Sequence, residues 1–353
     1  MRVALGMSGG VDSSAAAVVL CDQGHQVVGF TLKVWDRSRC CSLEDVADAR
    51  RVAARLDLPF YVLDAHDEFQ RQVVDPFVAA YAAGTTPNPC IWCNQRVKFR
   101  WLLERARALG CDAVATGHYA RLVDGPAGRR LLRGVDRAKD QSYFLVPAAP
   151  DGLDRVLFPL GERTKEQVRA LAESAGLPVA RKADSQDVCF VPEGDLAGFL
   201  ARYLPRREGE IVDRQGRVLG HHRGVHGFTV GQRRGLGVSA PEPLYVIASD
   251  PPTARVVVAP RRALWAEGLV GAGAVWLSGA DDRVTLACAV QLRSTGRAVP
   301  CRVENHGDQV RVTFEAPQFG VAPGQMAVFY SGDEVLGGAW IAEAVNSEQG
   351  RVG

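Results

Sequence analysis

The sequence predicts an α/β region built on a doubly wound parallel sheet, followed by two β-rich regions. Three observations predict this fold class. Short β-type runs alternate with helical segments through the first half of the chain, which is the pattern of βαβ units. A turn rich in glycine and serine joins the first run to the first helical segment. After about residue 205, helical periodicity fades and short apolar runs alternate with Gly, Pro and Asp turns.

The elements of the α/β region follow one another at regular spacing. The expected helix at 11–21 is followed by Gly24 as its stop signal. The expected helix at 164–175 has Thr164 as N-cap and Gly176 as its stop signal. Because parallel strands are joined by helices, these elements predict a doubly wound arrangement. The expected strands are 2–5, 26–32, 60–63 and 113–116, and the other expected helices are 43–56 and 96–109.

The second half of the chain has the features of all-β structure. It contains the runs VVVAP, VTLACAVQL, QVRVTFE and MAVFY, which alternate with turn residues. We expect boundaries near residues 205 and 265. These divide the chain into a catalytic domain at 1–205, a central β-rich domain at 206–265 and a C-terminal β-barrel at 266–353.

The composition is that of an ordinary globular protein. The chain has 353 residues, of which 47% are hydrophobic and 23% charged, and these values exclude collagen, coiled-coil and disordered classes. No apolar run approaches the roughly 18 to 20 residues of a membrane span, and the N-terminal residues lack the features of a signal peptide. We therefore expect a cytoplasmic protein with no membrane partner.

The charge is small but unevenly distributed. A net charge of +2 does not by itself indicate a nucleic-acid partner. Residues 202–234, however, hold eight arginines against three acidic residues. Such a run is typical either of a solvated surface or of contact with a polyanion, and charge alone does not separate the two.

The turn after the first strand has the composition of a phosphate-binding loop. Gly9 and Gly10 allow the backbone to approach an anion, and the first turn of the next helix offers N–H groups and the positive end of its dipole. Ser13 and Ser14 add hydroxyl donors, and Asp12 either caps the helix or binds magnesium. The alternative is an ordinary strand-turn-helix connection. The turn has neither the GxxxxGK[ST] nor the GxGxxG pattern.

Nine cysteines in a long chain without a secretion signal do not predict a disulfide framework. Four lie in apolar or strand-like context and are expected to be small buried hydrophobic residues: Cys21, Cys111, Cys288 and Cys301. The other five lie in polar or turn-rich context: Cys40, Cys41, Cys90, Cys93 and Cys189.

Cys93 and Cys189 are the candidate reactive thiols. Cys93 lies just before an expected helix, near whose N-terminus a thiolate is favoured, and Cys189 follows the polar run DSQD in an expected loop or edge. Two alternatives stay open. Either thiol is a buried structural residue, or Cys90 and Cys93 form half of a zinc site, for which the sequence offers no second CxxC or His pair.

Seven segments together carry a resemblance that most of them do not carry singly. In chain order, they resemble the motifs of bacterial tRNA-specific 2-thiouridylases, within the PP-loop superfamily of N-type ATP pyrophosphatases. The resemblance extends from Met1 to about Ala344 and implies an adenine nucleotide α-hydrolase-like fold for the first region. The segments are SGGVDSS (8–14), TPNPCIWCN (86–94), TGHYA (116–120), KDQSYFL (139–145), DSQDVCF (184–190), FTVGQRRGLG (228–237) and PGQMAVFY (323–330).

This resemblance implies an ATP-dependent sulfur transfer to tRNA, with ATP and Mg2+ as cofactors. ATP adenylates O2 of the uridine at the first anticodon position, so that the oxygen leaves with AMP and pyrophosphate is released. Sulfur reaches Cys189 as a persulfide from a sulfur-relay or cysteine desulfurase protein. Cys93 then attacks, either releasing hydrosulfide or forming a disulfide with Cys189. The product is 2-thiouridine in tRNAs of the Lys, Glu and Gln type.

The resemblance also assigns roles outside the two cysteines. Without it, His118 is interpreted more simply as a structural histidine and Arg293 as a solvated surface residue. The residues expected to bind ATP are Gly6, Met7, Ser8, Gly9, Gly10, Val11, Asp12, Ser13, Leu32 and Gly117. The residues expected to contact the target base or the tRNA are Asn88, Pro89, Cys90, His118, Lys139, Asp140, Gln141, Arg293, Ser294 and Gln325.

Two features depart from the family pattern. Where much of the family has an Asp after Asn-Pro, a candidate general base, this chain has Cys90, and a thiol is a poorer base at neutral pH. Cys90, Cys93 and Cys189 also permit an iron-sulfur cluster with one open iron, or the first two form a disulfide. The second departure is the pair Cys40-Cys41, which we interpret as incidental.

Two other functions compete with this assignment. One is a PP-loop synthetase that adenylates a small molecule, which needs neither a thiol pair nor a basic β extension. The other is an RNA-binding or sulfur-carrier protein without catalysis, against which the intact loop and both cysteines argue. Pyrophosphate release with and without tRNA separates the three.

Overall fold

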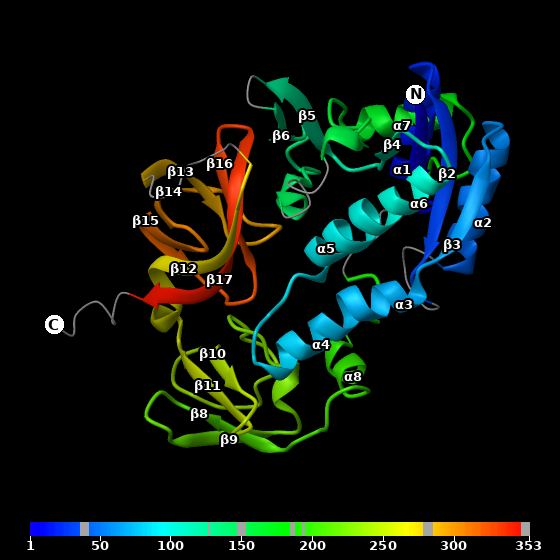
Figure 1. The fold of residues 1–353 in the computed structure, drawn as a ribbon. Coiled ribbons are helices and arrows are strands. Elements are labelled where there is room, and N and C mark those ends of the chain that lie inside the picture. Colours follow the sequence, from blue (N-terminus) through cyan, green and yellow to red (C-terminus); the bar gives the residue numbers. More distant parts are fainter. Residues whose placement is uncertain are drawn as a thin grey trace.

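Three sheets organise the protein in its computed structural model (Figure 1). The structure describes residues 1–35, 42–125, 128–146, 153–183, 188–192, 195–277 and 285–346. The pair Cys40-Cys41 and the run DSQD at 184–187 lie outside these ranges. The fold class predicted from the sequence is confirmed: a doubly wound α/β region is followed by a β-rich central region and a β-barrel.

The first sheet is the predicted parallel sheet. Its strand order is β3-β2-β1-β4-β7, and all neighbours are parallel. The order reverses beside β1, so β1 and β4 flank the switch point at which ligands bind in open α/β sheets. The strands are β1 (Arg2–Gly6), β2 (Gln26–Lys33), β3 (Phe60–Asp64), β4 (Ala113–Ala115) and β7 (Val156–Leu157), of which only β7 is not among the expected ones.

Helices cover both faces of this sheet because its strand residues alternate between the faces. Val3 and Leu5 pack under helices α1 (Val11–Asp22), α2 (Leu43–Arg55) and α7 (Lys165–Ser174). Ala4 packs instead under α6 (Leu102–Ala108). Capping boxes start α2 at Ser42 and α7 at Thr164, which confirms the predicted Thr164 N-cap.

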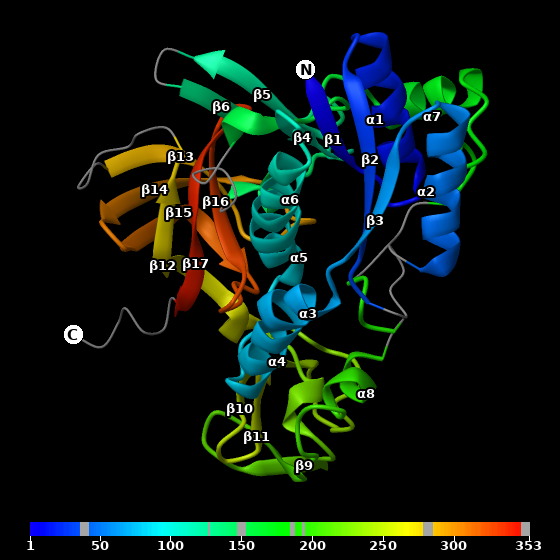
Figure 2. The ribbon, with the colours of Figure 1, turned by 45° about the vertical axis from the view of Figure 1, so that its right-hand side comes forward.

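Two helical runs cross from the sheet towards the β regions (Figures 1 and 2). The first, which the sequence analysis did not predict, joins α3 (His66–Phe69), a π-helical segment (Gln70–Val74) and α4 (Asp75–Ala82). The second joins α5 (Pro89–Trp92), a π-helical segment (Cys93–Trp101) and α6, and begins earlier than the expected 96. A short helix, α8 (Leu196–Leu200), packs against the first run. No helix in the described ranges combines the length and apolar character needed to cross a membrane.

The central sheet has the order β10-β11-β8-β9 and encloses its own apolar cluster. It lies at the lower end of the molecule in Figure 1. Only the pair β11 and β8 is parallel. The strands are β8 (Gly209–Val212), β9 (Val218–His222), β10 (Leu244–Asp250) and β11 (Arg255–Pro260).

The last sheet closes into a six-stranded barrel, because β12 pairs with both β15 and β17. A hairpin from the α/β region, β5 (Ala120–Gly125) and β6 (Gly128–Arg133), extends it through a pairing of Leu132 with Glu334. Ile91 and Phe99 share an apolar cluster with Met326 and Val328 of the barrel. The two regions therefore share a core. The barrel strands are β12 (Trp265–Trp276), β13 (Thr285–Gln291), β14 (Val299–His306), β15 (Gln309–Phe319), β16 (Met326–Ser331) and β17 (Glu334–Asn346).

The four cysteines expected in the core divide into two groups. Cys111 and Cys301 are buried, as predicted. Cys21 and Cys288 are only half-buried and pack at the margins of their clusters. Cys288 and Cys301 face each other on β13 and β14, with 3.7 Å between the sulfur atoms.

Candidate functional site

The predicted phosphate loop joins β1 to α1 at the switch point of the sheet. The Met7 N–H donates to the Phe30 carbonyl at 2.7 Å, and the Thr31 hydroxyl donates to the Met7 carbonyl at 2.7 Å. Gly10 is the N-cap of α1 and no side chain caps it, so the alternative that Asp12 caps the helix is wrong. Because the first N–H groups of a helix have no intrahelical acceptor, they are available to an anion.

Glycines allow three segments to meet around this loop. Gly9 has a φ of +71°, and a Cβ there would lie 2.1 Å from the carbonyl oxygen of Asp45 on α2. A Cβ on Gly117, just after β4, would lie 2.9 Å from the backbone of Asp12 and Ser13. The structure thus brings the expected nucleotide residue Gly117 directly against the start of α1.

The loop hydroxyls are engaged with the loop itself. The Ser13 hydroxyl accepts from the Ser8 N–H at 3.1 Å and lies 3.2 Å from the Gly10 carbonyl, to which it donates. The Ser14 hydroxyl donates to the same carbonyl at 2.9 Å. These bonds hold the loop in shape without consuming the first N–H groups of α1.

Asp12 is paired with a lysine that the sequence analysis did not single out. Lys165, the first residue of α7, has its ammonium 2.7 and 2.8 Å from the two Asp12 carboxylate oxygens. The Tyr119 hydroxyl donates to the same carboxylate at 2.7 Å. The Lys165 side chain is 12% exposed and that of Asp12 35%. The pair therefore sits at the edge of the loop, with its carboxylate partly open to solvent.

A second unpredicted lysine bridges the loop to α2. The Lys182 ammonium lies 3.2 Å from the Gly9 carbonyl, 2.7 Å from Asp45 and 2.5 Å from Asp48. Burial lowers the pKa of Lys182, but its bonds to the two carboxylates outweigh burial and leave the pKa raised. Burial raises the pKa of Asp48, but its bonds to Lys182 and Arg51 leave that pKa lowered. Lys182 thus stays charged beside the loop.

The low lysine content of the chain could have indicated these two residues. The chain has only five lysines against 37 arginines, and two of the five lie beside the phosphate loop. An ammonium is a compact point charge, whereas a guanidinium is a planar fork. A lysine kept in an arginine-rich chain is therefore a candidate for a site where a small cation is required.

The two candidate thiols come from distant segments and pack on one cluster of side chains. Cys93 and Cys189 are both half-buried, and both lie against this cluster. Phe190, next to Cys189, anchors the turn, with its ring centroid 5.1 to 5.5 Å from those of three neighbouring rings. We call the set of four rings the aromatic cluster: Phe69, Phe77, Phe190 and Phe199.

The local setting of Cys93 differs from the expectation. The helical run begins at Pro89, so Cys93 lies inside it rather than just before its N-terminus. A thiolate at Cys93 therefore gains no support from the first turn of a helix. Cys90 lies three residues earlier, which places the two thiols on one side of the run.

The iron-sulfur alternative does not fit this arrangement. Among the residues that the structure describes, which include Cys90, Cys93 and Cys189, no three His, Cys, Asp or Glu side chains group closely enough to hold a metal ion. The same finding applies to a zinc site at Cys90 and Cys93.

The residues expected near the target base form the start of α5. Asn88 is its N-cap and Pro89 its first residue, and both are buried. Leu32, on β2, packs against both the apolar cluster that the two thiols contact and the cluster under α6. Gln325, from the turn before β16, donates from its amide to the Thr86 carbonyl at 2.7 Å. The structure therefore brings Gln325 to the segment that leads to Asn88.

His118 is buried rather than exposed on the surface. Its side chain is 8% exposed, its Nδ1 lies 2.7 Å from the Thr116 hydroxyl, and the rings of Phe99 and Phe158 flank it. Burial lowers the pKa of His118 well below its usual value, and the charge of Lys98 adds to the effect. The ring is neutral at physiological pH, and its predicted contact with tRNA stays a prediction.

Asp140 and Gln141 organise the turn that holds them. The Asp140 carboxylate accepts from the backbone of Gly134 and from Arg133 at 2.7 Å. The Gln141 amide oxygen accepts from the Tyr119 N–H at 3.0 Å. Both side chains are committed to internal bonds, while Lys139 beside them is half-exposed.

The predicted loop at Arg293 and Ser294 is tied to the same turn. The Gln291 amide donates to both of their carbonyls at 3.1 Å, and its oxygen accepts from Arg133 at 3.0 Å. The Arg133 guanidinium lies 3.5 Å over the Tyr330 ring. Arg293 is exposed and Ser294 half-buried. Arg133 thus links the hairpin of the α/β region to the barrel loop.

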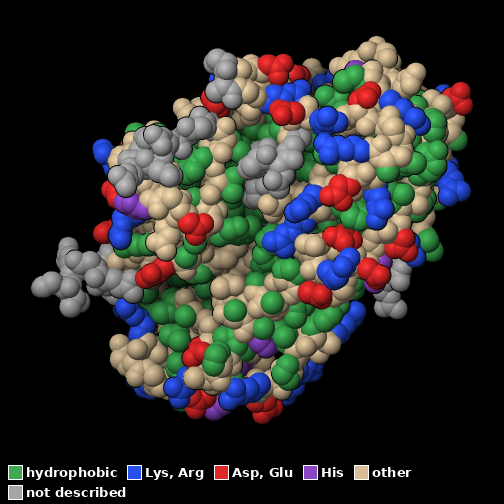
Figure 3. All heavy atoms as spheres, in the orientation of Figure 1, with side chains coloured by type: hydrophobic (Ala, Val, Ile, Leu, Met, Phe, Trp, Pro, Cys, Tyr) green, Lys and Arg blue, Asp and Glu red, His purple; other side chains and the backbone are tan. Residues whose placement is uncertain are grey.

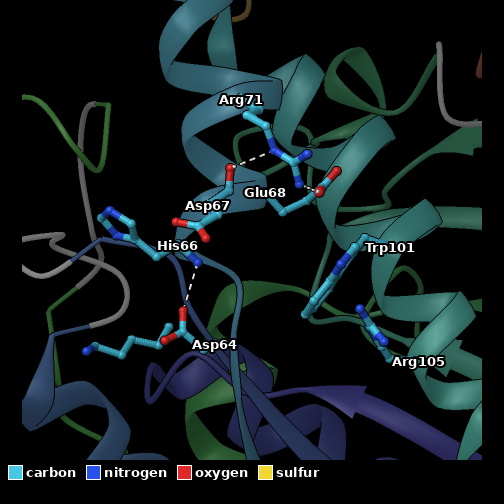
Figure 4. A pocket seen from close by; sticks show the side chains of 8 residues that line it. Asp64, His66, Asp67, Glu68, Arg71, Trp101 and Arg105 are labelled. Carbon is cyan, nitrogen blue, oxygen red and sulfur yellow. Dashed lines mark hydrogen bonds and ion pairs between the residues drawn. The ribbon is translucent and has the colours of Figure 1, made fainter.

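A polar hollow of about 550 Å³ lies at the carboxyl ends of β2 and β3 (Figure 4). Arg71 donates there to Glu68 at 2.7 Å, and the His66 N–H donates to Asp64 at 3.0 Å. The hollow lies away from the switch point between β1 and β4, so we place the candidate site at the phosphate loop. The lining residues are Lys33, Asp64, His66, Asp67, Glu68, Arg71, Trp101 and Arg105.

Three family models match successive parts of the chain. The tRNA methyl transferase HUP domain matches residues 1–193, the tRNA methyl transferase PRC-barrel domain 197–260 and the Aminomethyltransferase beta-barrel domain 267–341. Among solved structures, a 4-thiouridine synthetase–RNA complex with bound ATP aligns with a TM-score of 0.37 and 18% identity, over 58% of this chain and 50% of that one. That likeness is too low to bear on function.

Curated relatives match nearly the whole chain. The tRNA-specific 2-thiouridylase MnmA of Geobacter metallireducens is 50% identical over 359 residues, which cover 98% of this chain and 97% of that protein. The MnmA of Rhodospirillum centenum is 51% identical over 361 residues, which cover 97% and 92%. The chain therefore belongs to the family of tRNA-specific 2-thiouridylases.

Proposed function

We propose that this protein is a tRNA-specific 2-thiouridylase, an ATP-dependent sulfurtransferase that acts on the first anticodon uridine of tRNA. The observation that carries the proposal is a phosphate loop at the switch point of the sheet, combined with two cysteines that pack on one buried apolar cluster. Relatives that are 50% and 51% identical over nearly the full chain bear that name. A synthetase for a small molecule needs no such thiol pair.

The first half-reaction activates the uridine oxygen with ATP. O2 of the base attacks the α-phosphorus, the α–β phosphoanhydride breaks, and pyrophosphate leaves. The first turn of α1 and the glycine cradle of Gly9, Gly10 and Gly117 fit the phosphates, because a Cβ at Gly9 or Gly117 would fill that space. Lys165 and Lys182 supply positive charge beside the leaving group.

The loop fits ATP better than it fits a metal ion. It offers one carboxylate, Asp12, for Mg2+, and both of its oxygens are bonded to Lys165. Magnesium bound with the nucleotide would neutralise phosphate charge. We assign to Asp12 the role of holding Lys165 beside the phosphates.

The second half-reaction transfers sulfur from a persulfide on Cys189. The Cys93 thiolate attacks the Cys189 sulfur, the bond within the persulfide breaks, and hydrosulfide leaves as a Cys93–Cys189 disulfide forms. Hydrosulfide attacks C2 of the uridine, and AMP leaves with the oxygen. A thiol reductant then reduces the disulfide and restores both cysteines as thiols. The persulfide itself comes from a sulfur-relay or cysteine desulfurase protein.

The β regions extend the site towards an RNA partner. We divide the chain into a catalytic domain at 1–205, a central domain at 206–265 and a barrel at 266–353. All eight arginines of the stretch 202–234 are exposed, and Lys and Arg side chains appear among acidic ones at the lower end of the molecule (Figure 3). Phosphate contacts from such a surface suit recognition of RNA by shape. Lys139, Arg293 and Ser294 are further candidate contacts.

The test is a thiolation assay with tRNA, ATP and either sulfide or a persulfide donor. Wild-type protein is expected to release pyrophosphate only with tRNA and to form 2-thiouridine. Cys93→Ser and Cys189→Ser should lose persulfide-driven thiolation and keep pyrophosphate release, while Cys111→Ser serves as a control thiol. Pyrophosphate release that ignores tRNA would instead identify a small-molecule synthetase. A Cys90→Ser variant reports whether that thiol acts as the general base.

A further inference from the structure

The segment that carries Cys90 and Cys93 is the beginning of the helical run that starts at Pro89, and this beginning has no side-chain cap. Residues 83–88 connect α4 to α5, which has only four residues before the π-helical segment begins at Cys93. Asn88, the N-cap of α5, makes no side-chain capping bond. Contacts from elsewhere in the fold therefore help to fix where this helical run begins.

The barrel forms hydrogen bonds with both backbone groups of Thr86, and we call this pair of bonds the grip. The Thr86 N–H donates to the Pro323 carbonyl at 3.1 Å. The Thr86 carbonyl accepts from the Gln325 side-chain amide at 2.7 Å. The grip lies seven residues before Cys93 and immediately before Pro87 and Asn88.

The gripping turn is itself rigidly attached to β17. The Gly324 N–H donates to the Ile341 carbonyl at 2.9 Å, and the Ile341 N–H donates to the Gln325 carbonyl at 2.8 Å. Gly324 has a φ of +92°, and a Cβ there would lie 3.0 Å from both the nitrogen and the oxygen of Thr86. Only glycine lets the turn approach Thr86 so closely.

The barrel makes a second contact, on the other side of Cys90. The Trp340 ring of β17 lies 5.7 Å from the Trp92 ring of α5, centroid to centroid. The central region holds the beginning of the segment, because a Cβ on Gly84 would lie 2.4 Å from the Ser249 carbonyl. Both β regions thus contact the thiol-bearing segment, and the barrel contacts it on both sides of Cys90, through the turn before β16 and through Trp340 of β17.

We propose that Gln325 is a positioning residue for the sulfur-transfer step, acting through the Thr86 carbonyl to hold the Asn88–Cys93 segment in register with the phosphate loop. The barrel therefore contributes to catalysis and not only to RNA binding. The proposal deepens the proposed function and rests on it for the role of Cys93, whereas the grip on Thr86 does not depend on that role. Removing the amide donor leaves the half-buried Thr86 held by one backbone hydrogen bond instead of two.

The test compares Gln325→Met, which keeps the length of the side chain and removes its donor, with Gln318→Met as a matched control. The Gln318 amide donates at 2.7 Å to Ala316 within its own strand, away from the segment. The first readout is the alkylation rate of Cys93 in the protein without tRNA, followed by peptide mass spectrometry with Cys21 as internal reference. The second readout is kcat and KM for tRNA in thiolation. Gln325→Glu serves as a second, polar variant without the donor.

We expect both Gln325 variants to change the Cys93 alkylation rate several-fold and to lower kcat by about tenfold, equivalent to about 1.4 kcal/mol, with KM for tRNA within about twofold. Gln318→Met should match wild type in both readouts. A raised KM with unchanged kcat and unchanged Cys93 alkylation would overturn the proposal and make Gln325 a tRNA contact only. If the wild type does not thiolate tRNA but the Gln325 variants still change the Cys93 alkylation rate, the contact at Thr86 would be supported and the proposed function rejected.

Discussion

Replacing Lys165 by methionine tests whether the ion pair with Asp12 serves the phosphate loop. The change keeps the length of the side chain and removes the charge that lies 2.7 and 2.8 Å from the carboxylate oxygens. Hydrogen bonds to charged groups contribute about 1.5 to 3 kcal/mol. The partial exposure of Asp12 and its remaining bond from Tyr119 reduce the expected loss of unfolding free energy to about 1 to 2 kcal/mol.

The effect on activity should exceed the effect on stability. Lys165→Met removes a positive charge and exposes a negative one beside the incoming phosphates. A unit charge about 6 Å from another contributes about 1 to 3 kcal/mol at effective dielectric constants of roughly 20 to 60. Pyrophosphate release at subsaturating ATP is therefore expected to fall by roughly tenfold to hundredfold.

The assay is tRNA-dependent pyrophosphate release, measured together with urea unfolding. Glu166→Gln is the matched control, since Glu166 is the exposed next residue of α7 and also changes the charge by one unit. It should keep wild-type activity and stability within about 0.5 kcal/mol. If Lys165→Met lost stability but kept the wild-type rate of pyrophosphate release at subsaturating ATP, the pair would be a structural contact without a role in ATP use.

Three further outcomes follow from the structure. Burial and the charge of Lys98 lower the pKa of His118 below that of an unfolded histidine, so the unfolded state binds the extra proton; stability should therefore fall as pH drops below about 6.5, with a His118 contribution of at most about 1.4 kcal/mol per pH unit. In urea titrations at several pH values, a His118→Gln variant should show a smaller slope than wild type, while the slope due to His222, whose pKa burial also lowers, should remain. Phe190→Ala, which empties the centre of the aromatic cluster, should lower the free energy of unfolding by about 3 kcal/mol or more and reduce sulfur transfer while sparing pyrophosphate release. The control Tyr203→Ala, at the exposed rim, should lower the free energy of unfolding by under about 1 kcal/mol. Equal losses of both activities in Phe190→Ala would contradict a local role. The double variant Arg206→Gln and Arg207→Gln should weaken tRNA binding, and its affinity should fall less steeply with salt, by the equivalent of about one to two phosphate contacts. An unchanged salt slope in filter-binding titrations would show that this stretch does not contact the RNA.

Local signals in the sequence were strong wherever short-range physics decides the structure. The four main strands of the parallel sheet read as short apolar runs between turns, and α7 has its N-cap at Thr164 with Gly176 just beyond its end. The phosphate loop was visible because glycine, serine and a following helix are needed together within a few residues. These features depend on backbone preferences and capping, which neighbouring residues determine.

The helical run from His66 to Ala82 shows where such signals stop. Pro76 within it resembles a helix break, yet the chain continues through a π-helical segment because Phe69 and Phe77 bury their rings against Phe190. The two-residue strand β7 was equally invisible, since its pairing with β4 comes from the sheet and not from its own residues.

By itself, the sequence determined the fold class, the phosphate loop and the two thiols to examine. Only the tertiary structure decided which partners these groups have. It paired Asp12 with Lys165, enclosed His118, committed Asp140 to Arg133, brought Cys93 and Cys189 to one cluster, and set Gln325 on Thr86. The physical reason is that each of these contacts joins residues far apart in the chain. Their geometry follows from how sheet, helices and barrel pack, which no local pattern of residues encodes.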